Sequence, residues 1–249
     1  MAELGERVGS YIIIVASLCM SLLIFPYSAS ADARSETADD AALFSLDFTH
    51  PREGAAHDWL RSKNFELKRD AAKPTHISLH HDDNRLHIVA RRPAFGLAIR
   101  PVDEVNASRL RLHWGVADYP EGVSYQHDID NEAIMVYVFF GKERLPSGEM
   151  FVPDSPYFIG FYLCPVGTDE VEQPYVGHHY RKTGRYVCVD HPPEGETVVS
   201  EIHLDQEFLD SFGVDALPPV SAVSIEVDTT DADNDGHAAA FIERLDFLD

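Results

Sequence analysis

The densest group of potential metal ligands in this sequence is an acidic loop near the C-terminus. Four aspartates occupy residues 228–236: Asp228, Asp231, Asp233 and Asp235. Carboxylates at alternate positions, followed by Gly236, which permits a sharp turn, are typical of Ca²⁺ loops. The twelfth loop position is Ile242 instead of the glutamate of an EF-hand. We therefore predict a structural calcium site of another type, and the alternative is a hydrated acidic hairpin.

Residues 75–90 hold a second set of potential metal ligands. Pairing Leu79 with Leu86 predicts a β-hairpin, whose two-residue turn is Asp82-Asp83. Its outward face then carries three histidines: His76, His80 and His87. These imidazoles could chelate Zn²⁺ or Cu²⁺ if they turn toward one another. Exposed histidines on a polar sheet face need no metal, so both interpretations stay open.

Aromatic side chains in predicted loops form a third group, which suits a carbohydrate ligand. They are interleaved with His and Asp, and the predicted ligand-binding residues are Trp59, Tyr119, Tyr125, His127, Asp128, Asp130, Tyr175 and Tyr180. Flat rings can stack on sugars while the polar groups bond to hydroxyls. The alternative is that these rings anchor their loops on the protein.

The sequence has no motif for nucleophilic catalysis or nucleotide binding. It lacks G-x-S-x-G, H-E-x-x-H, a phosphate loop and G-x-G-x-x-G. A carboxylate pair such as Asp128 and Asp130, assisted by His127, could cleave glycosidic bonds. A glycan hydrolase or lyase is therefore the catalytic alternative to a binding protein.

The segments that must position these side chains are short strands. Alternating or two-faced apolar runs occur at 43–48, 75–80, 85–90, 108–114, 133–140, 157–163, 185–189, 197–204, 220–227 and 238–247. One helix is indicated between Asp205, which can cap it, and Gly213, which can end it. The pattern predicts an all-β fold, an antiparallel β-sandwich of jelly-roll type with about ten strands and one short helix.

Composition and charge narrow the class further. The 249 residues are 45% apolar and carry a net charge of −22. That charge excludes a basic surface for nucleic acid, and the apolar content is sufficient for a folded core. We expect a single domain over 43–249, preceded by an acidic flexible leader over 32–42. The oligomeric state stays open.

The N-terminus predicts export. Residues 1–31 combine Arg7, an apolar run over 11–25 and the small-residue series Ala29-Ser30-Ala31, as in a secretory signal peptide. The apolar run is shorter than the roughly 20 residues that a membrane anchor needs. We therefore expect cleavage after Ala31 and a periplasmic or secreted protein whose mature domain is not inserted in the membrane.

Two cysteines, Cys164 and Cys188, remain after that cleavage. An even pair in an oxidising compartment predicts a disulfide. Two buried free thiols are the alternative, because the sequence does not give the separation of their Cα atoms.

Short motifs punctuate the predicted strands. They include Asp58-Trp59, LRLHWGV over 110–116, DNEA over 130–133 and IEVDTTDADNDG over 225–236. In this order the motifs resemble the bacterial secreted domain-of-unknown-function family 3047. The resemblance spans about residues 43–248; it implies a jelly-roll sandwich and export, and it implies no catalytic residues.

Together these patterns favour an exported, non-catalytic binding module. Its expected ligand is a glycan or another component of the cell envelope, with calcium as a structural ion and no organic cofactor. A glycan-active enzyme and a structural envelope protein without a small ligand are the alternatives.

Overall fold

The structure is a computed structural model. It describes residues 41–49, 55–122, 129, 131–147, 152–167, 174–177, 179–232 and 235–249. All described residues belong to the second of the two units of the chain, Asp39–Asp249. The predicted signal peptide lies outside the described residues, as does all but the end of the predicted leader. Within the described residues, no helix is long and apolar enough to cross a membrane.

Strands dominate the described residues of the second unit. They are β1 (Phe44–Asp47), β2 (Glu66–Arg69), β3 (Ile77–Asp82), β4 (Arg85–Arg91), β5 (Phe95–Val105), β6 (Arg109–Asp118), β7 (Glu132–Leu145), β8 (Ser155–Leu163), β9 (Tyr175–Val176), β10 (Gly184–Asp190), β11 (Val198–His203), β12 (Val220–Asp228) and β13 (His237–Leu248). The helices are α1 (Ala56–Ser62), a 3₁₀ turn η1 (Asp70–Ala72) and α2 (Leu204–Phe212).

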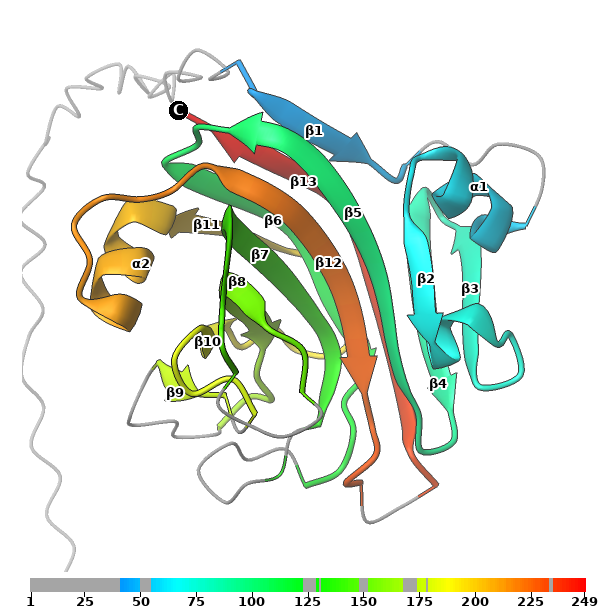
Figure 1. Ribbon diagram of the computed structural model, residues 1–249. Coiled ribbons are helices and arrows are strands. Elements are labelled where there is room, and N and C mark those ends of the chain that lie inside the picture. The colour runs from blue at the N-terminus through cyan, green and yellow to red at the C-terminus, as the bar shows by residue number, and fades with distance from the viewer. Residues whose placement is uncertain are drawn as a thin grey trace, which may run out of the picture. The chain divides into compact units, whose positions relative to one another are not determined.

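The strands form two sheets (Figure 1). A six-stranded sheet has the order β11-β6-β13-β4-β3, with β1 also paired to β13, and a seven-stranded sheet has the order β2-β5-β12-β7-β8-β10-β9. The prediction of an all-β sandwich of jelly-roll type is confirmed. One neighbouring pair, β8 and β10, runs parallel instead of antiparallel.

The core lies between the two sheets. It joins Leu112 and Trp114 of β6 and Phe247 of β13 to Val136 of β7 and Ile225 of β12. Trp114 is fully buried, and its indole Nε1 donates a 2.9 Å hydrogen bond to Ser200 Oγ on β11. Alternate residues of the seven-stranded sheet must therefore point away from this core. We call that opposite side the outer face.

The strand β5 shows why sequence patterning underestimated the seven-stranded sheet. Its small residues Gly96 and Ala98 are buried, whereas Phe95, Leu97 and Ile99 are half-buried. A Cβ atom at Gly96 would lie 2.4 Å from Ile77 Cδ1, so the core side has no room for a side chain. The bulky residues thus occupy the outer face, the reverse of an ordinary half-buried strand.

The predicted register of the β3–β4 hairpin is wrong by two residues, because Leu79 lies opposite Ile88 instead of Leu86. His80 is opposite His87, and the turn is Asp83-Asn84. Both turn residues have positive φ, 46° and 59°, as a two-residue type I′ turn requires. The leucine pattern did not decide between the registers, because a shift of two keeps every side chain on its face. The turn geometry decided it.

The structure places two helices where one was predicted. The expected helix is α2, which ends at Gly213 with φ 65° in the left-handed conformation. The additional helix α1 has only seven residues, too few for a periodic pattern to stand out.

Candidate functional site

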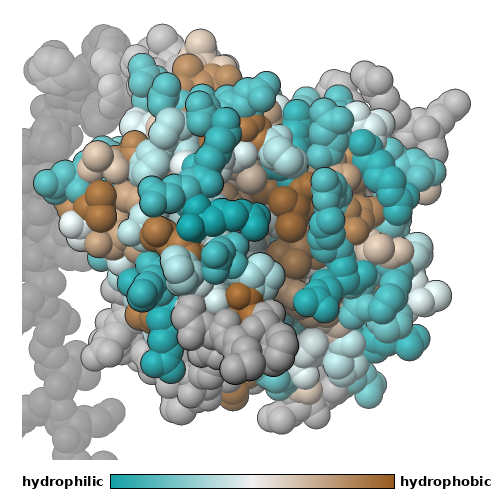
Figure 2. Space-filling view, in the orientation of Figure 1, coloured by the Kyte–Doolittle hydropathy of each residue, from teal (hydrophilic) through white to brown (hydrophobic). Residues whose placement is uncertain are grey.

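The outer face of the seven-stranded sheet carries a cleft of about 1110 Å³. Its described walls come from β2, β5, β12, β7, β8 and β10 and from the segments that precede β8, follow β12 and precede β10. Figure 2 shows apolar residues in a hollow at the middle of the visible face, with hydrophilic residues around it. A large cleft of mixed polarity is the usual form of a ligand site.

Strand alternation turns a row of aromatic side chains into this cleft. On β7, Val136 and Val138 belong to the core, while Tyr137 and Phe139 line the cleft. Gly160 on β8 leaves the space that the Tyr137 ring and the Met135 side chain occupy. A Cβ atom at Gly160 would lie 2.3 Å from Met135 Sδ and 2.9 Å from Tyr137 Cε1.

The aromatic rings contact one another along the cleft. Phe158 lies at the centre of the group, 5.5 Å from Tyr137 and 5.3 Å from Tyr180 between ring centroids, both in edge-to-face geometry. Phe139 is 5.5 Å from Phe158, and Tyr186 is 6.2 Å from Tyr137. Rings held by mutual contacts form a preorganised apolar surface.

Two buried glutamates share the cleft with these rings. Glu226 of β12 is 4% exposed and Glu132 of β7 is 2% exposed. The hydroxyl of Tyr137 donates a 2.6 Å hydrogen bond to Glu226 Oε1. Glu132 is the cross-strand partner of Asp228, which also lines the cleft. An irregularity in β12–β7 pairing between Glu226 and Asp228 accompanies this arrangement.

Charged residues around the cleft are mostly acidic. Among the described lining residues, six are carboxylates, namely Asp103, Glu132, Asp154, Glu226, Asp228 and Asp231. Three are permanent cations, namely Arg69, Lys142 and Arg144. One of the cations, Lys142, forms a 3.1 Å ion pair with Glu104. The electrostatic potential of the cleft therefore disfavours an anionic ligand.

The predicted aromatic ligand residues are only partly assembled here. Tyr180 lines the cleft, and Tyr175 lies on the edge strand β9 opposite Tyr186. Trp59 and Tyr119 are not among the lining residues. Tyr125, His127, Asp128 and Asp130 lie outside the described residues.

Trp59 and Tyr119 anchor local structure. Trp59 is buried, 5.7 Å from Phe48 and 4.9 Å from His81 between ring centroids, so it fixes α1 to its neighbours. The Tyr119 hydroxyl donates a 3.0 Å hydrogen bond to the Pro192 carbonyl. Burial, and secondarily Glu194, raises the pKa of Tyr119 far above its usual range.

The acidic loop contributes two aspartates to the cleft, Asp228 and Asp231. Asp228 Oδ1 accepts hydrogen bonds from the backbone nitrogen and Oγ1 of Thr230, at 2.8 and 2.6 Å. Asp235 is exposed, and Asp233 lies outside the described residues. In the part of the chain that the structure describes, these aspartates do not form a group of three with ligand atoms within 4.8 Å. The calcium site stays a prediction.

The histidine face contains a stacked pair. The rings of His80 and His87 lie 5.0 Å apart with an interplanar angle of 11°. His76 instead contacts Asp70, with a distance of 3.2 Å from Nδ1 to Oδ1. Burial, and secondarily His80, lowers the pKa of His87. Metal binding by the three histidines stays a hypothesis.

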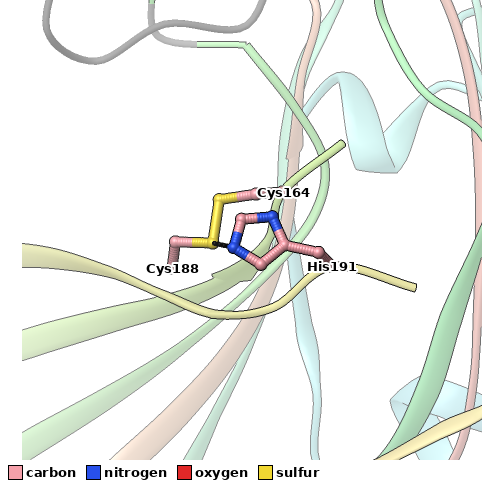
Figure 3. Close-up of side chains that lie close together, drawn as sticks. All are labelled: Cys164, Cys188 and His191. Atoms are coloured by element: carbon pink, nitrogen blue, oxygen red, sulfur yellow. Dashed lines mark hydrogen bonds between the residues drawn. A yellow bond between two sulfur atoms is a disulfide. The ribbon is translucent and has the colours of Figure 1, made fainter. Parts of the chain in front are cut away.

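The predicted disulfide is present between Cys164 and Cys188, with Cα atoms 5.9 Å apart. It connects the residue that follows β8 to β10, and thus joins the ends of the parallel pair. His191 Nε2 lies 3.8 Å from Cys188 Sγ, and its Nδ1 lies 3.2 Å from the Pro165 carbonyl oxygen (Figure 3). The Cys188 side chain also packs against the aromatic group of the outer face.

Sequence reasoning missed the two buried glutamates. The available signal was a carboxylate within an otherwise apolar segment: Glu226 interrupts VSIEV, and Glu132 directly precedes AIMVYVFF. A charged residue in a segment that patterning places in a central strand is rarely buried without a reason. The sequence-based prediction instead chose Asp128 and Asp130, which precede β7 in the chain.

Neither a protein-family model nor a curated protein matches the chain, so membership of family 3047 stays a prediction. Several solved structures are similar at low identity. The xyloglucanase domain of NopAA, a type three effector from Sinorhizobium fredii, in complex with cellobiose, is 10% identical over 64% of this chain and 80% of that chain, with a TM-score of 0.34. The potassium-bound carbohydrate recognition domain of Emp46p is 8% identical over 83% of this chain and 97% of that one, with a TM-score of 0.40.

Winged bean acidic lectin, complexed with methyl-α-D-galactose, is 10% identical over 81% of this chain and 96% of that chain, with a TM-score of 0.38. Identities and TM-scores this low leave the function of the chain to be inferred from its own cleft.

Proposed function

We propose that the protein binds a glycan chain in the cleft on the outer face. The observation that carries this proposal is the combination of aromatic rings with buried carboxylates in one cleft. Phe158, Tyr180 and Tyr186 offer apolar faces for the C–H surfaces of sugar rings. Glu132 and Glu226 offer oxygens that accept hydrogen bonds from sugar hydroxyls.

The size and charge of the cleft indicate the length and the charge of the glycan that would bind. Sites for small ligands occupy about 300–1,000 Å³, and this cleft exceeds them at about 1110 Å³, which suits several sugar units. The excess of carboxylates in its lining and the net charge of −22 favour an uncharged glycan over a uronate or sulfated one. The acceptor-rich lining matches the many hydroxyl donors of a neutral sugar.

Two features of the chain favour an oxidising compartment. The predicted signal peptide directs the chain to such a compartment, and the disulfide between Cys164 and Cys188 is stable there. Sequencing the N-terminus of the protein from an envelope fraction should show that it begins after Ala31. A chain that still begins at Met1 would contradict export by this route.

Calorimetric titration with uncharged oligosaccharides tests the binding function. We expect Phe158→Ala or Tyr186→Ala to weaken binding by about tenfold or more, since stacking contributes about 0.5–1.5 kcal/mol beyond the area that each ring buries. Tyr119→Phe is the matched control, because Tyr119 lies outside the lining and should leave affinity unchanged. If neutral glycans do not bind while the folded protein is intact, the structural envelope protein becomes the better hypothesis.

A further inference from the structure

Three side chains that can bind a soft metal ion meet at the end of the parallel strand pair. Cys164 directly follows β8, Cys188 lies in the last part of β10, and His191 directly follows β10. The two sulfurs and one imidazole nitrogen all lie within 4.8 Å of one another. No other three His, Cys, Asp or Glu side chains among the described residues bring ligand atoms this close.

The strand pairing explains why these residues meet. β8 and β10 run parallel, so both strands end at the same edge of the sheet. Their pairing is irregular between Cys188 and Asp190, where β10 has one residue more than β8. An extra residue of this kind redirects the side chains beside it. The backbone nitrogen of Cys164 donates a 3.0 Å hydrogen bond to the Asp190 carbonyl, so the backbone itself holds the two strand ends together.

The imidazole of His191 is oriented as in a metal-bound histidine (Figure 3). Its Nδ1 lies 3.2 Å from the Pro165 carbonyl oxygen, which only accepts hydrogen bonds, so the proton of the neutral ring belongs on Nδ1. Nε2 then carries the lone pair, and it lies 3.8 Å from Cys188 Sγ. Metal-binding histidines typically donate their other ring N–H to a carbonyl or carboxylate in this way.

The spacing of these atoms is close to that of a tetrahedral zinc site. Zn–S bonds of about 2.3 Å and Zn–N bonds of about 2.0–2.1 Å place a sulfur and a nitrogen ligand about 3.6 Å apart. The observed distance from Cys188 Sγ to His191 Nε2 is 3.8 Å. Two sulfur ligands would lie about 3.8 Å apart, so the sulfurs must separate before an ion binds both of them.

The exposure of the three residues provides a way in for an ion. Cys164 is fully buried, Cys188 is half-buried and His191 is exposed. A metal site needs such an entry path. The ion would therefore arrive from the side of His191.

We propose that the reduced chain binds one Zn²⁺ through Cys164, Cys188 and His191, and that the disulfide and the zinc site are alternative states of this cluster. Thiolate and imidazole ligands favour zinc over the hard ions calcium and magnesium. Three protein ligands leave the fourth tetrahedral position for water. This inference is independent of glycan binding.

The change of state balances with a dithiol as the reductant. The dithiol reduces the bond between the two sulfurs to two thiols and is itself oxidised to a disulfide. Zn²⁺ then replaces the two thiol protons, which pass to solvent, and binds the neutral imidazole. Oxidation of the two thiolates by another disulfide forms the bridge again and releases the ion.

Zinc would restore the cross-link that reduction removes. Either the disulfide or the ion joins the end of β8 to the end of β10. The reduced protein without metal should therefore be the least stable of the three states.

The experiment compares the oxidised and the reduced state of one protein. The full chain carries Cys19→Ser, so that Cys164 and Cys188 are its remaining cysteines. The bridge is reduced with a phosphine, which is removed in the absence of oxygen, and Co²⁺ is added as a spectroscopic substitute for Zn²⁺. We expect the absorption of tetrahedral, thiolate-bound Co²⁺ at one equivalent in the reduced protein and none in the oxidised protein. Zn²⁺ should then displace Co²⁺, because it binds such sites more tightly.

His191→Ala tests the third ligand. His191 is exposed, so the substitution should leave the fold intact. Losing the partner behind a ligand typically weakens metal binding by about 10–100-fold, and losing the ligand itself should weaken it at least as much. His203→Ala is the matched control, because His203 is an exposed histidine at the end of β11 and should leave the affinity unchanged.

Thermal melting gives a second measurement. Reduction should lower the melting temperature, and saturating Zn²⁺ should raise that of the reduced protein by several degrees. The same Zn²⁺ concentration should change the oxidised protein far less. Alkylating both thiols of the reduced protein should abolish the effect, since an alkylated sulfur cannot form a thiolate.

Three results would overturn the proposal. One is a Co²⁺ spectrum that does not differ between the oxidised and the reduced protein. Another is an unchanged metal affinity in His191→Ala. The third is a bridge that is reduced only when the protein unfolds, with no refolding on addition of Zn²⁺.

Discussion

The hydroxyl of Tyr137 on β7 donates a 2.6 Å hydrogen bond to Glu226 on the neighbouring strand β12. This contact ties the aromatic part of the cleft to its acidic part. Both residues are almost fully buried, at 8% and 4% exposure, so the bond forms where water competes little.

Removing this donor should destabilise the protein. For Tyr137→Phe we expect a loss of about 1–3 kcal/mol, because the buried acceptor Glu226 loses this hydrogen bond. Urea unfolding of the wild type and of the variant measures the difference in free energy.

Tyr119→Phe is the control for that measurement. It removes a phenol donor from the uncharged carbonyl of Pro192, so we expect a smaller effect of about 0.5–1.5 kcal/mol. Equal losses in the two variants would contradict a special role for the Tyr137–Glu226 bond.

Gly160→Ala should damage the cleft. The new Cβ atom would lie within 3.0 Å of Met135, Tyr137 and Tyr186, so the rings must move, at a cost of about 1–3 kcal/mol in stability. We expect glycan affinity to fall as well. Gly96→Ala creates a similar clash on the core side, against Ile77 and Ala71, and should lower stability with a smaller effect on affinity. Titration and melting of both variants give the comparison.

Reducing the disulfide should lower stability substantially. Cys164 and Cys188 are separated by 24 residues, for which loop-closure entropy predicts about 3–4 kcal/mol. At about 2–4 °C per kcal/mol the melting temperature of Cys164→Ser plus Cys188→Ser should fall by roughly 6–15 °C. A dithiothreitol titration of the wild type should reach the same endpoint. An unchanged melting temperature would show that the cross-link contributes nothing.

Acid should destabilise the protein through three histidines that are buried or partly buried. Desolvation lowers the pKa of His57, with a secondary effect of Arg61, and of His81 and His87, with secondary effects of His80. Their pKa values in the unfolded chain are near 6.5, so on acidification the unfolded chain takes up protons first. Stability from these groups is complete above about pH 6.5 and is lost as pH falls through the lowered values.

Melting curves between pH 7.5 and 5 test this direction. His81→Gln should flatten the dependence of melting temperature on pH, because one of the partly buried imidazoles is no longer present to titrate. His203→Gln, at an exposed position, should leave it unchanged. A wild type that gains stability on acidification over this range would contradict the prediction.

Calcium binding by the acidic loop stays a prediction with a direct test. An ion that binds only the folded protein stabilises it by about 2.7 kcal/mol at one hundred times Kd, or several degrees in melting temperature. Asp231→Ala plus Asp233→Ala should abolish the shift, whereas Asp205→Ala plus Asp210→Ala on α2 should preserve it. Equal shifts in the two double variants would identify the loop as merely hydrated.

The sequence alone determined the class of fold and several local features. Alternation along 85–90 and 108–114 marks half-buried strands, because one face of each strand must meet an apolar core. Gly213 after an amphipathic stretch fixed the end of α2, since only glycine adopts its left-handed conformation readily. The even cysteine pair predicted the bridge that the structure contains.

Only the tertiary structure decided which residues share the cleft. Tyr137 and Glu226 are 89 residues apart, and they meet because β7 and β12 pair in the sheet. Strand order and register arise from packing between distant segments, which local pattern does not encode. The sequence pattern also did not predict the strand β5. Its large side chains face the cleft, and its small residues face the core, where the opposite sheet leaves no room for larger ones.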